Sequence, residues 1–591
     1  MAFVQTEKWT GSDSRTKAEA RSPGLETGLR ATFVASAALL GAIESWANQN
    51  AINPDGVSYL DIARQFAGGH WHAAITGMWS PLYSLVLALA LAVTRVGTSN
   101  DYVVAHAVNF AVYLCSVASF ELFLGELIRA NEQSAEARLQ PWLVRSIGYA
   151  IFLWCALRII NLSVVAPDLL VATAIYLACA LLIRIRTRSA GWLSFLGFGW
   201  VLGFGYLAKA PILPIGLVFI GAAFWPARGK RLQIPELIAT IAGFAVVVLP
   251  YVVVLSNAEG HLTFSEAGPV NYAWHVQGVA PYHWQGDPEG SGRPEHPTRQ
   301  IHSAPTAFEF ASPLPGTYPV WYDPSYWYKG LTSHFSFSAQ LRAVRKNLVE
   351  YNAILLYLYP VALVWAFIAF KNRRKPLAGI DYRPVVWAAL ITLALFSLVH
   401  VEARYIAPFV AVLITVIFAV QRQVDKTLAL AAAAVVLIIL GGSMIPMFAR
   451  NVLAAVRHHP DEYRQVAAEL GKFGITSGDW IASTRNSNIA NAKWAHLAGV
   501  RIVAEVCDNS DESWAANPKD EFWAATPAVR SNILQSFAAT GASAVVADHA
   551  PPQAKEEHWL RIANTSYFIY LLRKPATEGY QVQAQPGTVA N

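Results

Sequence analysis

Charged side chains are scarce in this sequence of 591 residues. Asp, Glu, Lys and Arg together make up 14% of it, whereas hydrophobic residues make up 54% and the mean hydropathy is +0.34. A soluble globular domain ordinarily carries about 25% charged residues. The composition therefore excludes an ordinary soluble domain and predicts a polytopic membrane protein. Its apolar runs are expected to be helices, because backbone groups in lipid must pair within their own segment.

Cysteine is also rare, with four residues in the chain. Cys115, Cys155 and Cys179 lie inside apolar runs, and Cys507 stands alone in the C-terminal part. No CxxC pair and no His/Cys ligand spacing occurs, so the sequence predicts neither a disulfide framework nor a zinc site. A glycine-rich nucleotide fingerprint and a repeat of solenoid period are missing too. So is a basic face interleaved with aromatic residues, which excludes nucleic acid as a partner.

The positive charge that is present gathers in short loops between apolar runs. The clusters are "RIRTR" (184–188), "PARGKR" (226–231) and "KNRRK" (371–375). Clusters of this kind mark cytoplasmic loops. With a cytoplasmic N-terminus, they predict about eleven crossings and a C-terminal part on the outer side.

Apolar runs that could cross the roughly 30 Å hydrocarbon layer recur along most of the chain. The odd number of crossings requires one early run not to cross. We expect this to be 80–97, as a re-entrant or interfacial element. The candidate segments are 31–47, 80–97, 103–127, 146–165, 168–183, 192–208, 210–226, 234–255, 352–370, 384–400, 405–421 and 427–448.

The predicted topology leaves two long loops, one short turn and the tail on the outer side. The loop 256–351 is rich in Pro, Gly, Trp, Tyr and His, and a loop of that size is typically a functional cover. The tail alternates helical and strand patterns, which predicts a layered α/β unit. The expected parts are a cytoplasmic tail 1–30, a transmembrane domain 31–450 with outer loops 48–79 and 256–351 and the turn 164–170, and an outer α/β domain 451–591.

The stretch "NPDGVSYLDIA" (53–63) places acids at the first exit from the membrane. Asn53 or Asp55 suits the cap of a short helix from about 56 to 68, with Pro54 in its first turn. A carboxylate at the water–lipid boundary also suits a general base that takes a proton from a hydroxyl group. The two interpretations of Asp55 are compatible.

Two further pairs of charges follow from spacing. Asp61 and Arg64 are placed as an i, i+3 surface pair on the same short helix. Asp168, after Pro167, either starts a membrane helix or is an acid near hydrocarbon that needs a partner. Arg158, one helix earlier, is a candidate for that partner, and its alternative role is to reach the interface with its long side chain.

Two outer turns carry cations where positive charge is less expected. Lys209 lies at a Pro-punctuated turn and either reaches for the interface or binds a phosphate. In "HVEARYIAPF" (400–409), Glu402 and Arg404 either neutralise one another or leave the forked guanidinium donors for phosphate oxygens. Acids and cations from four separate loops or turns are thus expected at one membrane face. That pattern fits a reaction between a lipid-anchored anion and a polar partner.

The order of these features resembles the glycosyltransferase-C superfamily. It is most similar to the bacterial branch that includes relatives of protein O-mannosyltransferases and lipid A aminoarabinose transferases. The resemblance covers about 31 to 450. It is carried by "NPDGVSYLDIA" (53–63), "GGHWHAAITGMWSPLYS" (68–84), "APDLL" (166–170), "GYLAKAP" (205–211) and "HVEARYIAPF" (400–409).

The resemblance implies a transferase that uses a sugar bound to a polyprenyl phosphate or diphosphate. It also implies a bacterial inner-membrane protein whose active site and C-terminal domain face the periplasm. The acceptor is expected to be a hydroxyl-bearing glycan, lipid or protein, and membrane lipids are further partners. The resemblance assigns Asp55 as base, Asp168 as second acid, and Lys209 and Arg404 to the donor phosphate. We also expect Arg158 at the donor phosphate, and Tyr59, His400, Glu402 and Tyr405 in support.

The chemistry of the residue types predicts inversion, because one base and one leaving group make a single displacement. The paired acidic motif of oligosaccharyltransferases is missing around Asp168. This leaves a divalent cation, Mg²⁺ or Mn²⁺, as an open question, and no other cofactor is indicated.

Two functions of other classes remain as alternatives. A transporter or flippase of lipid-linked saccharides would also hold charges near lipid, although transporters often show repeated halves and broken helices at the midplane. A non-catalytic scaffold would tolerate neutralisation of the charges. The aromatic residues of the large loop either stack on sugar rings or rest on lipid headgroups; they are Trp274, Trp284, Trp321 and Trp327.

Overall fold

The structure is a computed structural model. It describes residues 23–133, 138–187, 191–225, 234–372, 381–457, 461–486, 491–507 and 520–572. Residues 1–22 of the predicted cytoplasmic tail and most of the basic clusters lie outside the described residues. The last part of that predicted tail, from Pro23, belongs to the first helix instead.

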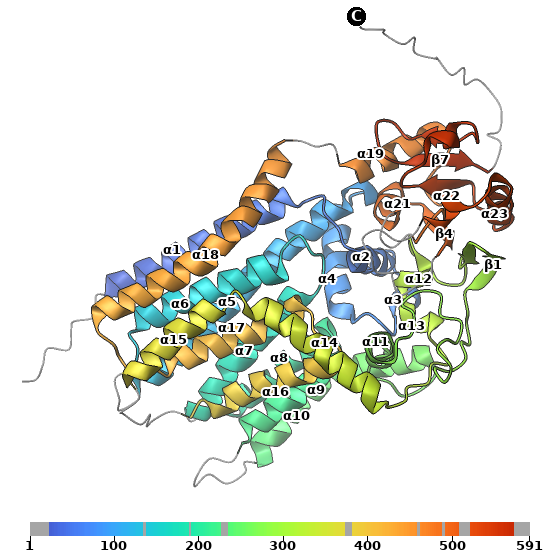
Figure 1. The fold of residues 1–591 in the computed structure, drawn as a ribbon. Helices are drawn as coiled ribbons and strands as arrows, with labels where there is room; N and C mark the ends of the chain where they lie inside the picture. Colours follow the sequence, from blue (N-terminus) through green and yellow to red (C-terminus); the bar gives the residue numbers. More distant parts are fainter. Residues whose placement is uncertain are drawn as a thin grey trace, which may run out of the picture.

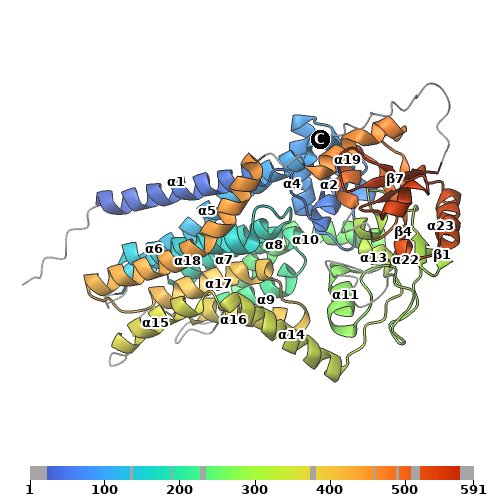
Figure 2. The same cartoon turned by 45° about the horizontal axis from the view of Figure 1, so that its top comes forward.

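A bundle of long helices makes up one end of the molecule (Figure 1). The same bundle appears after a 45° turn, with the first helix along its edge (Figure 2). Most of its helices start and end close to the predicted apolar runs, but the helix Phe337–Leu355 lies mostly in the predicted loop 256–351. They are α1 (Pro23–Ala47), α5 (Asp101–Glu132), α6 (Pro141–Leu153) with the π-helical turn Trp154–Ile160, α7 (Asp168–Thr187), α8 (Trp192–Ala208), α9 (Ile212–Ala223), α10 (Ile234–Glu259), α14 (Phe337–Leu355), α15 (Tyr359–Asn372), α16 (Arg383–Val399), α17 (Ala403–Ala419) and α18 (Lys426–Val456).

Five of the described helical segments are long and apolar enough to cross a membrane, and the chain is a multi-pass membrane protein. A sixth candidate is the pair α14 and α15, which is bent by 75°. The predicted run 352–370 covers most of α15 and only the end of α14. Other apolar helices are shorter, among them α4 (Pro81–Thr94) in the predicted non-crossing segment. At 1.5 Å per residue, its 14 residues reach about 21 Å, less than the hydrocarbon layer. The total of about eleven crossings stays a prediction.

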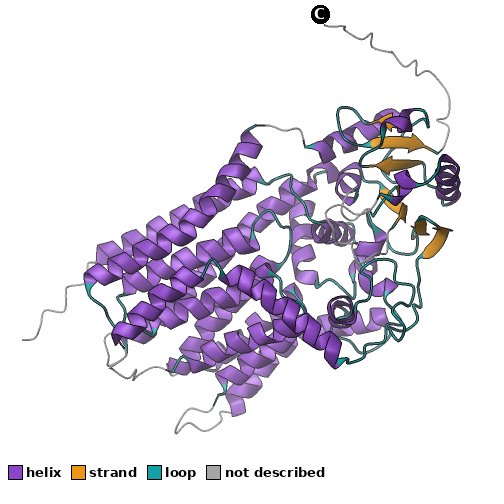
Figure 3. Cartoon of the chain, viewed as in Figure 1, coloured by secondary structure: helices purple, strands orange, loops and turns teal. Residues whose placement is uncertain are grey.

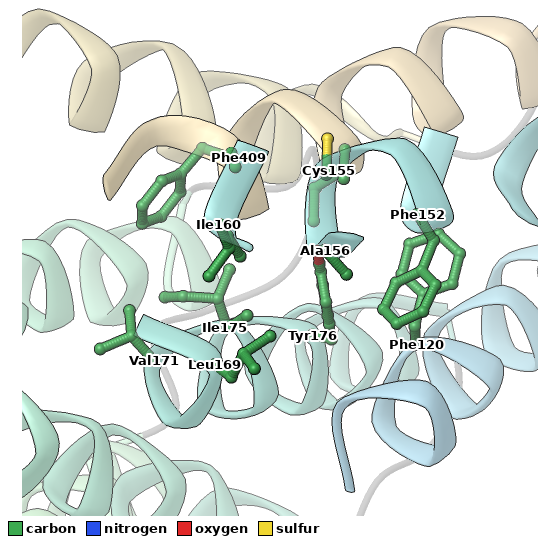
Figure 4. Packing of buried hydrophobic residues seen from close by; sticks show 14 of the residues in the cluster. Phe120, Phe152, Cys155, Ala156, Ile160, Leu169, Val171, Ile175, Tyr176 and Phe409 are labelled. Carbon is green, nitrogen blue, oxygen red and sulfur yellow. The ribbon is translucent and has the colours of Figure 1, made fainter. Parts of the chain in front are cut away.

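Aromatic side chains pack the centre of the bundle (Figure 4). Phe120 stacks on Phe152 with ring centroids 4.8 Å apart and meets Tyr176 edge-on at 5.0 Å. Lipid is as apolar as these side chains, so the hydrophobic effect does not drive membrane helices together. Their association depends instead on close van der Waals packing of this kind. The cluster includes Leu169 of α7 and Phe409 of α17 (Figure 4). It therefore packs the beginning of α7 against α17.

Short elements of the loops 48–79 and 256–351 lie between the bundle and a β-sheet (Figure 1). The first loop forms α2 (Pro54–Ala67) and α3 (Trp71–Ala74), and α2 packs on α4. A single 3₁₀ turn, Thr98–Asn100, leads into α5. The large loop forms α11 (Ala267–Tyr272), the π-helical turn Ala273–Gln277, α12 (Pro319–Tyr322), α13 (Pro324–Trp327) and the strands β1 (Arg299–Ser303) and β2 (Thr306–Glu309).

The strands gather at one end of the molecule (Figure 3). They form one sheet in the order β1-β2-β4-β3-β5-β7-β6. β3 (Trp480–Ser483) pairs in parallel with β4 (Arg501–Val506) and β5 (Ala544–Ala547), and β7 (Phe568–Leu571) and β6 (Leu560–Arg561) continue antiparallel. The tail helices are α19 (Glu462–Glu469) with the 3₁₀ turn Leu470–Phe473, α21 (Ala492–Ala498), α22 (Glu521–Ala524) and α23 (Pro527–Ala539), and a last 3₁₀ turn is Pro552–Lys555.

The predicted α/β pattern of the tail is thus present in β3, β4, β5 and β7. The sequence did not show that the sheet continues into the large loop, where β2 pairs antiparallel with β4. The tail and the loop share one sheet, so the loop is anchored at that end.

Candidate functional site

The first turn of α2 presents Asp55. Pro54 occupies the first helical position, as predicted, but the side chain of Asn53 does not cap the helix. Its Oδ1 instead accepts a hydrogen bond of 2.8 Å from the backbone N–H of Val165. This bond ties the start of α2 to the turn that leads into α7, which brings Asp55 towards Asp168.

Asp168 begins α7 and is almost fully buried, with 3% of its side chain exposed. Its Oδ1 lies 2.7 Å from Nζ of Lys209, at the end of α8. The ammonium group of Lys209 also lies 3.5 Å from the ring centroid of Tyr405. A buried carboxylate is costly without a cation, so the charge of Lys209 compensates the desolvation of Asp168.

Arg404, in the first turn of α17, joins three carboxylates. Its Nη2 lies 3.2 Å from Oδ2 of Asp55 and its Nη1 lies 3.5 Å from Oδ2 of Asp168. Its Nε lies 2.7 Å from Oε1 of Glu402. We call Asp55, Asp168, Lys209, Glu402 and Arg404 the charge cluster. Its members come from four separate loops or turns, and both of its cations are ion-paired.

Sequence reasoning did not single out Trp321 as a neighbour of Asp55. Its indole N–H donates a 3.1 Å hydrogen bond to Oδ1 of Asp55 across 266 residues of sequence. Its ring stacks on Trp274 with centroids 5.4 Å apart, and Trp79 lies beside it at 6.4 Å. The signal in the sequence was the aromatic density of 317–330. The large loop therefore contributes two stacked indole rings and one hydrogen-bond donor to the site.

The supporting residues surround the cluster. Tyr59, one helical turn after Asp55, is buried and packs edge-on against Trp79. His400 stacks on His275 of the large loop, with centroids 3.9 Å apart, and its Nε2 lies 4.0 Å from Glu402. Burial lowers the pKa of His275 to about 3, and the neighbouring His400 and Lys346 act in the same direction. His275 is therefore neutral near pH 7.

Two predicted pairings are wrong. Arg158 lies 5.8 Å from the ring centroid of Tyr357 and contacts the sulfur of Met447, whereas Asp168 pairs with Lys209 and Arg404. The π-helical turn that carries Arg158 directs its side chain to this other contact. Its proposed role at the donor phosphate stays a prediction.

Asp61 and Arg64 do not form a surface pair. Asp61 is buried and its carboxylate binds the backbone N–H and hydroxyl of Thr317 and the ring of His496. Arg64 pairs with Asp101. Both residues lie on α2 as expected, but their partners come from other segments that pack against this helix.

The carboxylates of the charge cluster are all engaged by Lys209 or Arg404, and a divalent cation there stays an open question. Within the described residues, the group of three His, Cys, Asp or Glu side chains whose ligand atoms converge is His283, Glu505 and Cys507. It contains no member of the charge cluster.

No family model matches the chain, and no curated protein matches it either. ArnT from Cupriavidus metallidurans bound to undecaprenyl phosphate is a similar solved structure, with 12% identity and a TM-score of 0.53 over 94% of this chain and 100% of that chain. Its apo state covers 92% and 98%, with 12% identity and a TM-score of 0.49. An Archaeoglobus fulgidus oligosaccharyltransferase covers 88% and 69%, with 12% identity and a TM-score of 0.46.

The first of these similarities shows the fold. The chain has the architecture of ArnT along almost its whole length. The similarity thereby confirms the fold that the sequence resemblance implied, and the fold alone.

Proposed function

We propose that this chain is a membrane glycosyltransferase that moves a sugar from a polyprenyl phosphate or diphosphate donor to a hydroxyl-bearing acceptor. The observation that carries the proposal is the ion pair of Asp55 with Arg404 beside the Asp168–Lys209 pair. The shared fold adds support, because that ArnT structure holds undecaprenyl phosphate. The hydroxyl belongs to a glycan, a lipid or a protein, and the sugar is a hexose or a pentose.

Asp55 suits the role of general base. Its side chain is 23% exposed, so one side remains open to an acceptor while Trp321 and Arg404 hold its two oxygens. A hydroxyl is a weak nucleophile near pH 7 and needs a positioned base. The acceptor oxygen attacks the anomeric carbon, its proton passes to Asp55, and the bond from the anomeric carbon to the phosphate oxygen breaks.

The reaction is a single displacement with inversion in this proposal. A retaining mechanism of double displacement would need a second carboxylate free to attack the sugar. Asp168 is buried and held by Lys209 and Arg404, so it is poorly suited to that role. We assign Asp168 as a positioning residue that keeps the two cations side by side.

Lys209 and Arg404 would stabilise the phosphate that leaves with the bonding electron pair. Fixed cations aimed at developing negative charge lower the barrier of such a step. Glu402 is the most exposed carboxylate of the cluster, with 39% of its side chain accessible. The donor phosphate would therefore replace Glu402 on Arg404 more readily than it would replace Asp168.

We further propose that this site lies at the periplasmic face of a bacterial inner membrane. The sheet that joins the tail to the large loop would cover the site from outside the membrane. Trp321 and Trp274 would then offer flat rings near the sugar.

The test is transfer of sugar from a synthetic polyprenyl phosphate sugar by the purified protein in detergent. We expect Asp55→Asn to lower the turnover number by at least about a hundredfold with donor binding retained. Lys209→Met should mainly weaken donor binding, because it removes a cation and not the base. Glu350→Gln, an exposed carboxylate on α14, is the matched control.

Two outcomes would contradict the proposal. Transfer at the wild-type rate by Asp55→Asn would exclude Asp55 as the base. Donor binding by the wild type with no transfer to any hydroxyl acceptor, but with movement of the donor across vesicles, would favour a flippase.

A further inference from the structure

Three buried side chains meet where the large loop packs on the tail. They are His283 from the loop and Glu505 and Cys507 from the end of β4. One nitrogen, one oxygen and one sulfur from them lie within 4.8 Å of one another. The side chains of His283 and Glu505 are 0% exposed. Nitrogen, oxygen and sulfur donors therefore converge in an interior that excludes water.

The ring of His283 is held in place from its other side. Its Nδ1 lies 3.0 Å from Oγ1 of Thr298, while Nε2 points at Oε1 of Glu505 at 2.9 Å. The ring is stacked on Phe308 with centroids 4.3 Å apart. Histidine ligands of metals commonly have the second ring nitrogen fixed in this way, because it sets the tautomer and the direction of the ligand atom.

The two tail residues are fixed by the sheet. Glu505 and Cys507 are two positions apart, and alternate residues along an extended strand point to the same side. Glu505 pairs in register with Phe308 of β2, and the N–H of Cys507 donates a 3.0 Å hydrogen bond to Thr306. The backbone that carries these two ligands is thus held on the loop side by hydrogen bonds.

A bound cation also suits the charge of the Glu505 carboxylate. Glu505 accepts a 2.6 Å hydrogen bond from the hydroxyl of Tyr318 besides its contact with His283. A carboxylate with no exposure is costly unless its charge is compensated. A dication bound by these three side chains would compensate the carboxylate and a thiolate of Cys507 together.

We propose that His283, Glu505 and Cys507 bind one divalent metal ion of the zinc type. Cysteine sulfur, imidazole nitrogen and carboxylate oxygen are the usual ligands of Zn²⁺, and three protein ligands leave one position for another donor. The ion would join the large loop, which carries Trp321, to the tail sheet. Because 222 residues separate His283 from Glu505, no motif in the sequence could have revealed the site.

The test is metal content of the full-length protein in detergent, after removal of bound metal and reloading with Zn²⁺ or Co²⁺. We expect about one ion per chain and, with Co²⁺, the thiolate-to-metal charge-transfer absorption that only a cysteine ligand gives. His283→Gln and Cys507→Ser should lower affinity by at least about tenfold. Cys115→Ser, at an exposed cysteine of the bundle, is the matched control.

Failure of the wild type to take up Zn²⁺ or Co²⁺ would overturn the proposal. So would uptake of Co²⁺ without the charge-transfer absorption, or an unchanged spectrum in Cys507→Ser. The Co²⁺ spectrum of the wild type tests cysteine ligation even where a variant fails to fold. None of these readouts depends on sugar transfer, so they stand apart from the test of the proposed function.

Discussion

At the scale of single residues, Asp55 is held by neighbours of two kinds. Arg404 contributes charge at one carboxylate oxygen, and Trp321 contributes a neutral hydrogen bond at the other. A base must point at the proton that it takes, and a small misplacement of a reacting group is costly. The indole N–H of Trp321 therefore matters for orientation, separately from the charge of Arg404.

We expect Trp321→Phe to lower the turnover number by roughly ten- to a hundredfold while the KM for the lipid donor stays nearly constant. The phenyl ring keeps part of the stacking on Trp274 but cannot donate to Asp55. Steady-state kinetics of sugar transfer would measure the change. Trp327→Phe is the control, since its indole N–H bonds to the carbonyl of Pro319 in the same loop. Equal losses in both variants would mean that loop integrity, and not the bond to Asp55, is responsible.

At the scale of elements, α8 and α10 approach so closely that only glycine fits between them. A Cβ at Gly199 would lie 2.0 Å from the carbonyl oxygen of Thr240, and one at Gly243 would lie 2.3 Å from that of Leu196. Small residues at a membrane helix interface allow such contact of backbones. Lys209 follows the last residue of α8, so this packing also helps to fix the position of Lys209 in the charge cluster.

Gly199→Ala should destabilise the protein by about 1–3 kcal/mol, because the clash is with backbone that cannot rotate away. The midpoint of thermal unfolding in detergent would report the loss. Gly197→Ala lies on the same helix with nothing within 4 Å of the added Cβ. It should be neutral or slightly stabilising, since alanine favours helix by roughly 0.5–1 kcal/mol. Equal destabilisation by both substitutions would contradict this account of the interface.

At the scale of the whole molecule, His496 joins the tail to both loops and to the bundle. Its Nδ1 lies 2.9 Å from Asp61 of α2, and its Nε2 lies 3.0 Å from Asp101 at the start of α5. Thr317 of the large loop binds the same Asp61 carboxylate. Burial lowers the pKa of His496, but hydrogen bonds to Asp101 and Asp61 outweigh it and raise the pKa to about 9.

The stabilisation from this contact should depend on pH. Because the pKa of His496 in the folded protein lies above its ordinary value of 6.5, the contribution is fully present below about pH 6.5 and is lost as the pH rises through about 9. We expect His496→Gln to cost about 3 kcal/mol at pH 6 and progressively less towards pH 9.

Thermal unfolding of both proteins across this pH range would measure the difference. His72→Gln, at an exposed histidine, should follow the wild-type profile. A constant gap between wild type and His496→Gln at every pH would show that His496 acts without its charge.

The sequence by itself determined most helices of the bundle and four strands of the tail. Apolar runs marked the helices of the bundle to within a few residues at most ends, and alternation marked β3, β4, β5 and β7. Both signals are local, since helical and extended periods are read within one segment. The sequence also indicated that acids and cations occupy the outer turns around Asp55, Asp168, Lys209 and Arg404.

Only the tertiary structure decided which of those groups are partners. Asp168 pairs with Lys209 and not with Arg158, and Asp61 turns from its helical neighbour to His496. The contacts of Trp321 with Asp55 and of His283 with Glu505 span more than 200 residues. Such choices depend on which elements pack together and how much water they exclude, and neither is encoded in local spacing.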